Sequence, residues 1–157
     1  MSVLSVAGLI VISFLTGCRP EGTVLDQEIE SFYFEPVGSG FAASVADTTE
    51  LVFRDRESWT DFRQRLAPLR DFPDVDFEQM MVIVAAVPAP TGGYFLEFEG
   101  FERIDGQLTA SYVVTQPGAD CVAITALTQP FQAIAARRVD GPVAFTSRTA
   151  TERCANV

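Results

Sequence analysis

The sequence predicts a mainly β (α+β) fold, an antiparallel β-sandwich or half-barrel with one amphipathic helix packed on the sheet. Short runs of apolar and β-branched residues recur along the chain, as expected of strands. Turn signals separate the later runs: Asp105-Gly106, Gln116-Pro117-Gly118 and Asp140-Gly141-Pro142. Because such connections are short, successive strands are expected to pair antiparallel.

Three short strands are expected before the helix. The sequence Ser31-Phe32-Tyr33-Phe34 predicts the first, closed by Pro36 and a turn at Gly38-Ser39-Gly40. Residues 41–46 and residues 50–54 predict the other two.

One stretch has the apolar spacing of an amphipathic helix. Asp55 or Ser58 can cap its start, and Pro68 ends it. Its apolar stripe must pack on a sheet face, so we expect Trp59 in the core rather than stacked on a ligand. The residues of the stripe are Trp59, Phe62, Leu66 and Leu69.

The strands after the helix surround a loop at residues 88–94, Pro-Ala-Pro-Thr-Gly-Gly-Tyr. The two prolines lack the backbone N–H that a strand donates to its neighbour in a sheet. The two glycines can adopt backbone angles that are unfavourable for other residues. The loop is either a structural turn or a contact surface for a partner, with Thr91, Gly92, Gly93 and Tyr94 as the candidate binding residues. The later strands are expected near residues 79–87, 94–103, 107–115, 122–127, 131–138 and 143–149.

The composition excludes several classes of function. All 11 basic residues are Arg, since the chain contains neither Lys nor His. This absence removes Ser/His, Cys/His and Ser/Lys catalysis, Schiff-base chemistry and imidazole metal ligands. A net charge of −10 argues against nucleic acid and anionic lipid surfaces. We therefore expect no catalytic residue, no metal and no cofactor.

The N-terminus predicts export and lipidation. Residues 3–15 form an apolar run of signal-peptide length, followed by Leu15-Thr16-Gly17-Cys18. This matches the lipobox of bacterial lipoproteins, in which cleavage precedes an acylated Cys18. We assign residues 1–17 to the signal peptide, 18–30 to a tether and 31–157 to the β domain, placed in the cell envelope and facing the periplasm or exterior. The alternatives are an ordinary secretory signal or a buried strand.

The two other cysteines, Cys121 and Cys154, are expected to form a disulfide, because an exported protein meets an oxidising compartment. Two free thiols or a metal pair are the alternatives, and the metal pair lacks further Cys or His ligands.

Charged residues offer weaker site candidates. Asp74, Asp76 and Glu78 could suggest a calcium site or a catalytic carboxylate pair, but acidic residues beside a strand are usually solvated and the EF-hand pattern is missing. Arg137-Arg138 could meet an acidic partner or pair with local carboxylates, and local pairing is favoured.

Five motifs follow one another along the chain: Arg56-Glu57-Ser58-Trp59, Pro73-Asp74-Val75-Asp76-Phe77, Met81-Val82-Ile83-Val84, Pro90-Thr91-Gly92-Gly93-Tyr94 and Gln129-Pro130-Phe131. In this order they resemble the C-terminal domain of the protease complex subunit PrcB family, from about residue 51 to residue 154. This resemblance implies an exported lipoprotein associated with a secreted or surface protease complex.

Thr91-Gly92-Gly93-Tyr94 is also similar, over these residues alone, to a loop element of chagasin-type protease inhibitors. The favoured hypothesis is a non-enzymatic, lipid-anchored protein that binds a protein partner, possibly a protease. A protease inhibitor acting by loop insertion is the runner-up, and an enzyme using carboxylates is the third.

Overall fold

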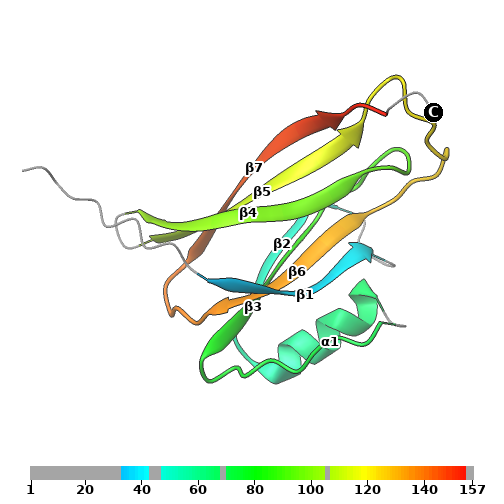
Figure 1. The fold of residues 1–157 in the computed structure, drawn as a ribbon. Helices are drawn as coiled ribbons and strands as arrows, with labels where there is room; N and C mark the ends of the chain where they lie inside the picture. Colours follow the sequence, from blue (N-terminus) through cyan, green and yellow to red (C-terminus); the bar gives the residue numbers. More distant parts are fainter. Residues whose placement is uncertain (1–32, 43–46, 68–69, 105–106, 155–157) are drawn as a thin grey trace, which may run out of the picture.

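The computed structural model describes residues 33–42, 47–67, 70–104 and 107–154 of the chain. A four-stranded sheet lies between a three-stranded sheet on one side and a single helix on the other (Figure 1). The structure is mostly β and does not close into a barrel. The predicted β-sandwich with one packed helix is therefore confirmed.

The four-stranded sheet has the order β1-β6-β3-β2 and is antiparallel throughout. Its two central strands are mostly buried on both faces, which explains why their sequences are apolar except at Gln132 and Arg137. The strands are β1 (Phe34–Phe41), β2 (Thr49–Phe53), β3 (Met80–Ala86) and β6 (Pro130–Arg137).

The three-stranded sheet has the order β4-β5-β7 and contains one parallel pair. Strands β4 (Phe95–Ile104) and β5 (Gln107–Pro117) form an antiparallel hairpin, whereas β5 and β7 (Val143–Glu152) run parallel. The fold is mainly antiparallel, as predicted, and the β5–β7 pair is the parallel exception among the described strands. Strand β6 lies between β5 and β7 in the sequence but joins the other sheet, so the chain enters β7 in the direction of β5.

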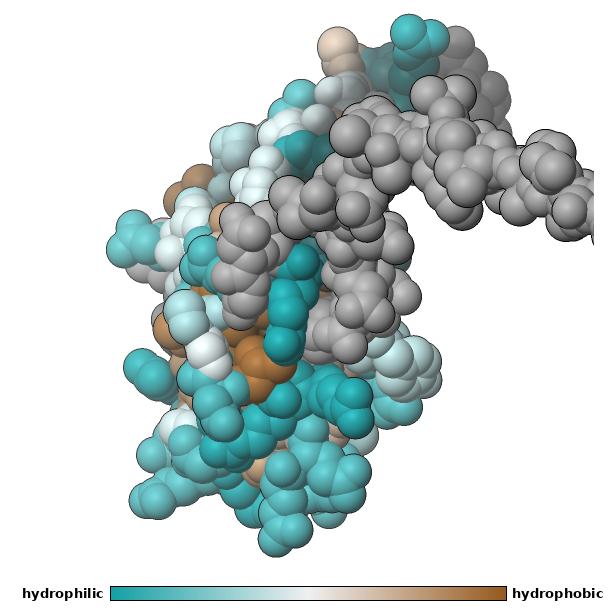
Figure 2. Space-filling view, turned by 90° about the vertical axis from the view of Figure 1, so that its left-hand side faces the viewer, coloured by the Kyte–Doolittle hydropathy of each residue, from teal (hydrophilic) through white to brown (hydrophobic). Residues whose placement is uncertain are grey.

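Two hydrophobic clusters lie on opposite faces of the four-stranded sheet. Side chains alternate along β3, so Val82 and Val84 face the helix while Met81 and Ile83 face the second sheet. The surface in Figure 2 is mostly hydrophilic, with a brown apolar area near its centre.

Helix α1 (Arg56–Leu66) packs on the first cluster as predicted. Asp55 is the N-cap, and its carboxylate accepts a hydrogen bond from the Ser58 backbone N–H at 2.8 Å. Trp59, Phe62 and Leu66 are buried, which confirms the core position of Trp59. Pro68 and Leu69 lie outside the described residues.

One of the predicted early elements was wrong. The turn expected at Gly38-Ser39-Gly40 lies within β1, which continues to Phe41 and shifts register between Pro36 and Gly38. A Cβ on Gly38 would lie only 2.7 Å from the ring of Phe72, so glycine is required by packing rather than by a turn. Of the strand predicted at residues 41–46, Phe41 ends β1, and residues 43–46 lie outside the described residues.

The strand predicted at residues 122–127 was also wrong. This segment carries the chain from one sheet to the other, and its apolar side chains Val122, Ile124 and Leu127 are exposed. An isolated bridge beside it pairs Ala89 with Thr128.

The predicted signal peptide, the tether and Cys18 lie outside the described residues, as do residues 31 and 32 of the predicted domain. Within the described part, no helix is long and apolar enough to cross a membrane.

Candidate functional site

Residues 88–94 carry the chain from one sheet to the other. Strand β3 ends at Ala86 in the four-stranded sheet, and β4 begins at Phe95 in the three-stranded sheet. The prolines and glycines therefore mark a crossing between layers rather than a tight hairpin within one sheet.

This crossing is held against the segment that leads into β6. Ala89 and Thr128 exchange two backbone hydrogen bonds, of 2.8 and 3.0 Å. The Thr128 hydroxyl also donates to the Thr91 carbonyl oxygen at 2.8 Å, and the Gly92 N–H donates to the Ile124 carbonyl oxygen at 3.0 Å. These contacts order both segments as one unit.

The two glycines of the crossing are required for different reasons. A Cβ on Gly92 would lie 2.5 Å from Cγ1 of Ile124, so close packing excludes a side chain there. Gly93 has a φ of 84°, in the left-handed region that favours glycine. Both glycines therefore have architectural roles, whatever the loop binds.

An open groove with a volume of about 930 Å³ lies between the two segments. Among the described residues that line it, none is charged, and most are apolar. Val122 and Leu127 are 104% and 88% exposed at its wall, and Ile124 is 69% exposed. The lining residues are Phe41, Ala42, Pro88, Ala89, Pro90, Gly92, Gly93, Val122, Ala123, Ile124, Leu127, Thr128 and Gln129.

The predicted contact residues only partly coincide with this groove. Gly92 and Gly93 line it, while Thr91 contributes a backbone oxygen that positions Thr128. Tyr94 is half-buried and is not among the lining residues. Sequence reasoning missed the apolar side chains of the opposite wall, because a short apolar run looks the same whether it forms a buried strand or an exposed loop.

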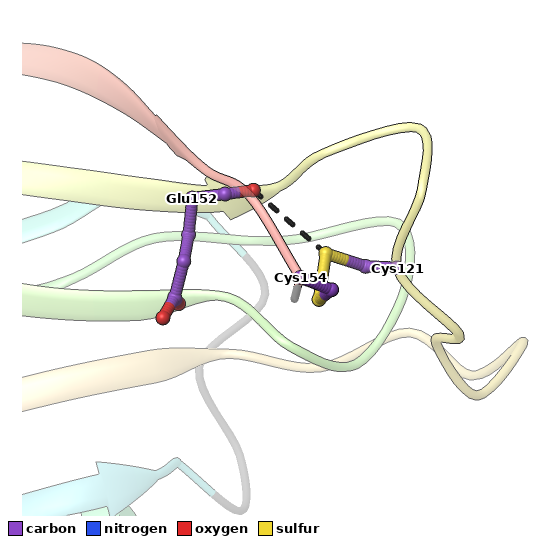
Figure 3. Close-up of a disulfide and its surroundings, with 3 residues drawn as sticks. All are labelled: Cys121, Glu152 and Cys154. Carbon is purple, nitrogen blue, oxygen red and sulfur yellow. Dashed lines mark hydrogen bonds between the residues drawn. A yellow bond between two sulfur atoms is a disulfide. The ribbon is translucent and has the colours of Figure 1, made fainter. Parts of the chain in front are cut away.

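A disulfide anchors that opposite wall, as predicted. Cys121 and Cys154 are bonded, with an S–S distance of 2.05 Å (Figure 3). The Gly118 N–H donates to the Glu152 carbonyl oxygen at 2.8 Å, and the Cys121 N–H donates to the Gly118 carbonyl oxygen at 3.0 Å. The bond therefore fixes the start of the groove wall to the end of β7.

The acidic residues considered as a site do not gather at the groove. Asp74 pairs with Arg56 at 2.9 Å, and Asp76 accepts the backbone N–H of Glu78 at 3.0 Å. Within the described residues, no group of three or more Cys, Asp or Glu side chains could hold a metal ion. These carboxylates serve a helix contact and a turn.

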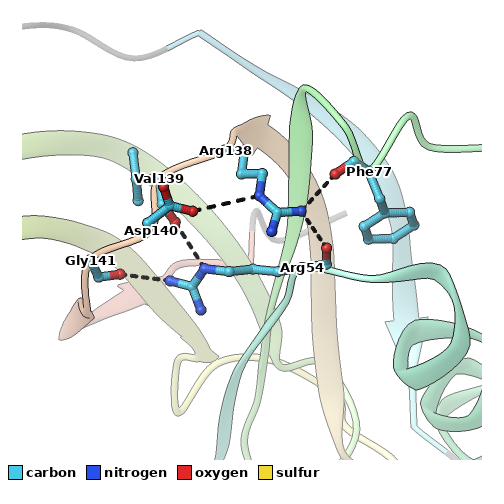
Figure 4. A network of polar contacts seen from close by, with 6 residues as sticks. All are labelled: Arg54, Phe77, Arg138, Val139, Asp140 and Gly141. Atoms are coloured by element: carbon cyan, nitrogen blue, oxygen red, sulfur yellow. Dashed lines mark hydrogen bonds and ion pairs between the residues drawn. The ribbon is translucent and has the colours of Figure 1, made fainter.

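Arg138 belongs to a network that joins three segments (Figure 4). One nitrogen, Nη1, donates to the carbonyl oxygens of Arg54 and Phe77 at 2.7 and 2.8 Å, and Nε lies 3.8 Å from Asp140. Arg54 in turn donates to the carbonyl oxygens of Val139 and Gly141. Arg138 thus pairs locally, chiefly with backbone oxygens rather than the carboxylates that were expected.

Tyr112, an ionisable group with a raised pKa, lies between the sheets and away from the groove. Tyr112 donates its hydroxyl to Glu50 at 2.7 Å, bridging β5 and β2. Burial, followed by this hydrogen bond to a carboxylate, raises the pKa of Tyr112 to about 12. The contact is structural, since it joins the two layers of the sandwich.

Comparison with known proteins gives one match, to the family model described as PrcB C-terminal, over residues 80–136. No curated protein and no solved structure matches the chain. The match includes the motifs at residues 81–84, 90–94 and 129–131, but not those at 56–59 and 73–77. It is therefore shorter than the expected span of about 51–154. Residues 80–136, which contain both central strands and most of the groove, match the model of the PrcB C-terminal family.

Proposed function

We propose that this chain is a lipid-anchored protein of the cell envelope whose β domain binds a partner protein in the groove, as a non-enzymatic subunit of a secreted or surface protease complex. The groove is built by residues 88–94 and 121–129, and most of it lies within the segment that matches the PrcB C-terminal family.

The observation that carries the proposal is the exposure of Val122, Ile124 and Leu127 beside an uncharged groove. Exposed apolar patches of this kind commonly mark protein contact sites. Burying one such side chain fully is worth roughly 1.5–3 kcal/mol. The disulfide at Cys121 and the hydrogen bond from Gly92 to Ile124 hold the wall in place, which reduces the ordering cost of binding.

The charge of the chain indicates the chemistry of the partner. The groove itself is uncharged, whereas the chain as a whole carries −10. A partner that presents an apolar side chain flanked by Arg or Lys would gain burial in the groove and electrostatic attraction during approach.

Export and anchoring rest on the sequence around Cys18. Acyl chains on this residue would hold the domain at a membrane, at about 0.8 kcal/mol per buried CH₂. Residues 19–30 would then separate the acidic domain from the lipid surface.

An inhibitor that acts by loop insertion is the second candidate. The element expected to insert, Thr91 to Tyr94, does not stand out from the surface, because Gly92 is buried beneath Ile124. The favourable observation lies on the opposite wall, where Val122 is fully exposed next to the disulfide and could enter a protease cleft.

Capture from detergent-solubilised cell envelope tests the proposal. The full chain should retain a protease activity that Ile124→Ser/Leu127→Ser fails to retain. Phe95→Ser is the matched control, because Phe95 is 58% exposed but does not line the groove. Equal capture by all three proteins would refute the groove as the binding site.

Titration of the captured protease with purified chain separates the two candidates. A subunit leaves the activity unchanged or raises it, whereas an inhibitor lowers it at stoichiometric dose.

A further inference from the structure

The two sheets present four edge strands, and three of them carry features that discourage pairing with another chain. Strand β1 contains Pro36 and a register shift, and β2 is only five residues long. Strand β4 has a register shift beside Gly100 and carries three carboxylates, Glu97, Glu99 and Glu102.

Strand β7 lacks these features. It is ten residues long, contains no proline, and pairs with β5 in an unbroken register over its whole length. Within the described part of the chain, no strand pairs with its other side, and it forms the outer edge of the upper sheet in Figure 1. Such an edge is a template for a further strand.

The charges of β7 do not protect the edge either. Its central charge, Arg148, reaches back across β5, where Nε donates to Glu99 at 2.8 Å and Nη2 forms a second, parallel bond to the same carboxylate. Pairing with Glu99 directs the guanidinium along the face of the sheet, so it does not block the outward backbone groups, while its charge still acts on a residue placed opposite it. The strand's one carboxylate, Glu152, is at its end.

The backbone groups that β7 offers can be assigned from its pairing. The Gly118 N–H donates to the Glu152 carbonyl oxygen, so even-numbered β7 residues direct their N–H and C=O groups towards β5. Odd-numbered residues, such as Phe145, Ser147 and Thr149, direct theirs outwards. Residues 146–149 are all exposed, so neither face of the strand is covered there.

We propose that a second copy of this chain pairs with β7 in antiparallel register, about a two-fold axis at Ser147, and joins the two three-stranded sheets into one. Ser147 then faces Ser147 of the second copy in a hydrogen-bonded pair, and Phe145 faces Thr149. Only residues with outward-facing backbone groups meet at these positions, as an antiparallel ladder requires.

Two criteria select this register: the charges that meet across the axis, and the length of β7 that pairs with the second copy. Arg148 lies opposite Thr146 of the second copy, so no like charges meet. Moving the axis one residue along, to Arg148, would set two guanidinium groups opposite each other, which is destabilising. A chain with a charge of −10 can approach its own copy most readily along a strand with a single terminal carboxylate. This inference does not depend on the proposed function of the groove.

Cysteine cross-linking of the full chain tests the register. Ser147→Cys brings two thiols together across the axis, because hydrogen-bonded antiparallel pairs have Cα atoms about 5.5 Å apart, within disulfide reach. The expected result is an oxidised covalent dimer that reduction reverses. Thr151→Cys is the matched control, since residue 151 faces residue 143 of the second copy and should stay monomeric on a non-reducing gel. No dimer with Ser147→Cys, or equal dimer with both, would overturn the proposal.

Charge variants test the same contact without a covalent bond. Thr146→Lys places Lys opposite Arg148 twice per dimer, which should weaken the dimer roughly two- to thirtyfold. Thr146→Glu should tighten it. Gln79→Lys adds the same charge at an exposed site outside β7 and should leave the dimer unchanged. The assay is the mass of the detergent-solubilised full chain across a dilution series. A monomeric wild type, or a Thr146→Lys protein indistinguishable from Gln79→Lys, would contradict the inference.

Discussion

Removing the disulfide gives the sharpest test of how the groove wall is stabilised. The bond between Cys121 and Cys154 closes a loop with a sequence separation of 33 residues that contains β6 and β7. It joins the segment that follows β5 to the end of β7, the neighbouring strand of the same three-stranded sheet. The perturbation is the double substitution Cys121→Ser/Cys154→Ser, which leaves two small polar side chains in place of the bond.

The expected loss follows from the size of the closed loop. On the chain-entropy account, a cross-link spanning about 33 residues lowers the entropy of the unfolded chain by roughly 12–13 cal/mol/K. At 25 °C this corresponds to about 3.8 kcal/mol of unfolding free energy. With an m-value near 1.5 kcal/mol/M, the urea midpoint should fall by about 2.5 M.

Urea unfolding, followed by Trp59 fluorescence, measures this loss. The wild type after reduction should unfold at the midpoint of the double variant, because both lack the same bond. A midpoint that moves by less than about 0.5 M would refute the reasoning, since the cross-link would then restrict the unfolded chain very little. A reduced wild type that differs from the double variant would trace the effect to the serines instead.

Three other predictions concern the sheets, the crossing and the anchor. The raised pKa of Tyr112 means that the folded protein holds its phenolic proton more tightly than the unfolded chain, so stability present below pH 10 is lost as pH rises towards 12. Tyr112→Phe should remove this alkaline loss, measured by urea midpoints from pH 8 to pH 12, and should cost about 1 kcal/mol at pH 8 through the lost bond to Glu50. Gly93→Ala should cost roughly 1–2 kcal/mol in urea unfolding because of the φ of 84°, whereas Gly100→Ala, with open space around its Cβ, should cost clearly less. Cys18→Ser should move the chain from the membrane fraction to the soluble fraction on a cell-fractionation immunoblot, and a variant that stays with the membrane would contradict lipidation at Cys18.

Local signals in the sequence predicted the elements whose own residues determine them. The spacing of Trp59, Phe62 and Leu66 predicted the helix, and Asp55 predicted its cap. The cysteine count, combined with the export signal, predicted the disulfide. These features depend on periodicity, capping and redox compartment, all of which a single sequence displays.

Errors arose where an element depends on residues far away in the chain. Nothing within residues 122–127 shows that they cross between sheets instead of pairing, and nothing in β7 shows that its partner is parallel. The turn expected at Gly38-Ser39-Gly40 failed for the same reason. Gly38 is small because Phe72, more than thirty positions away, packs over it.

The groove itself is a consequence of topology that no local motif could predict. Strand β3 passes to β4 and strand β5 passes to β6 by changing sheets, and these two crossings are residues 87–94 and 118–129. The antiparallel bridge between Ala89 and Thr128 shows that the crossings meet at the same end of the sandwich. A crossing must leave both ladders, so its apolar side chains have no strand neighbours to cover them, and those of Val122 and Leu127 remain exposed. The disulfide then compensates for the missing ladder by fixing the second crossing to β7. It follows that loss of the bond should disturb the wall formed by residues 121–129 before it disturbs residues 88–94, whose glycines are constrained by their own backbone and packing.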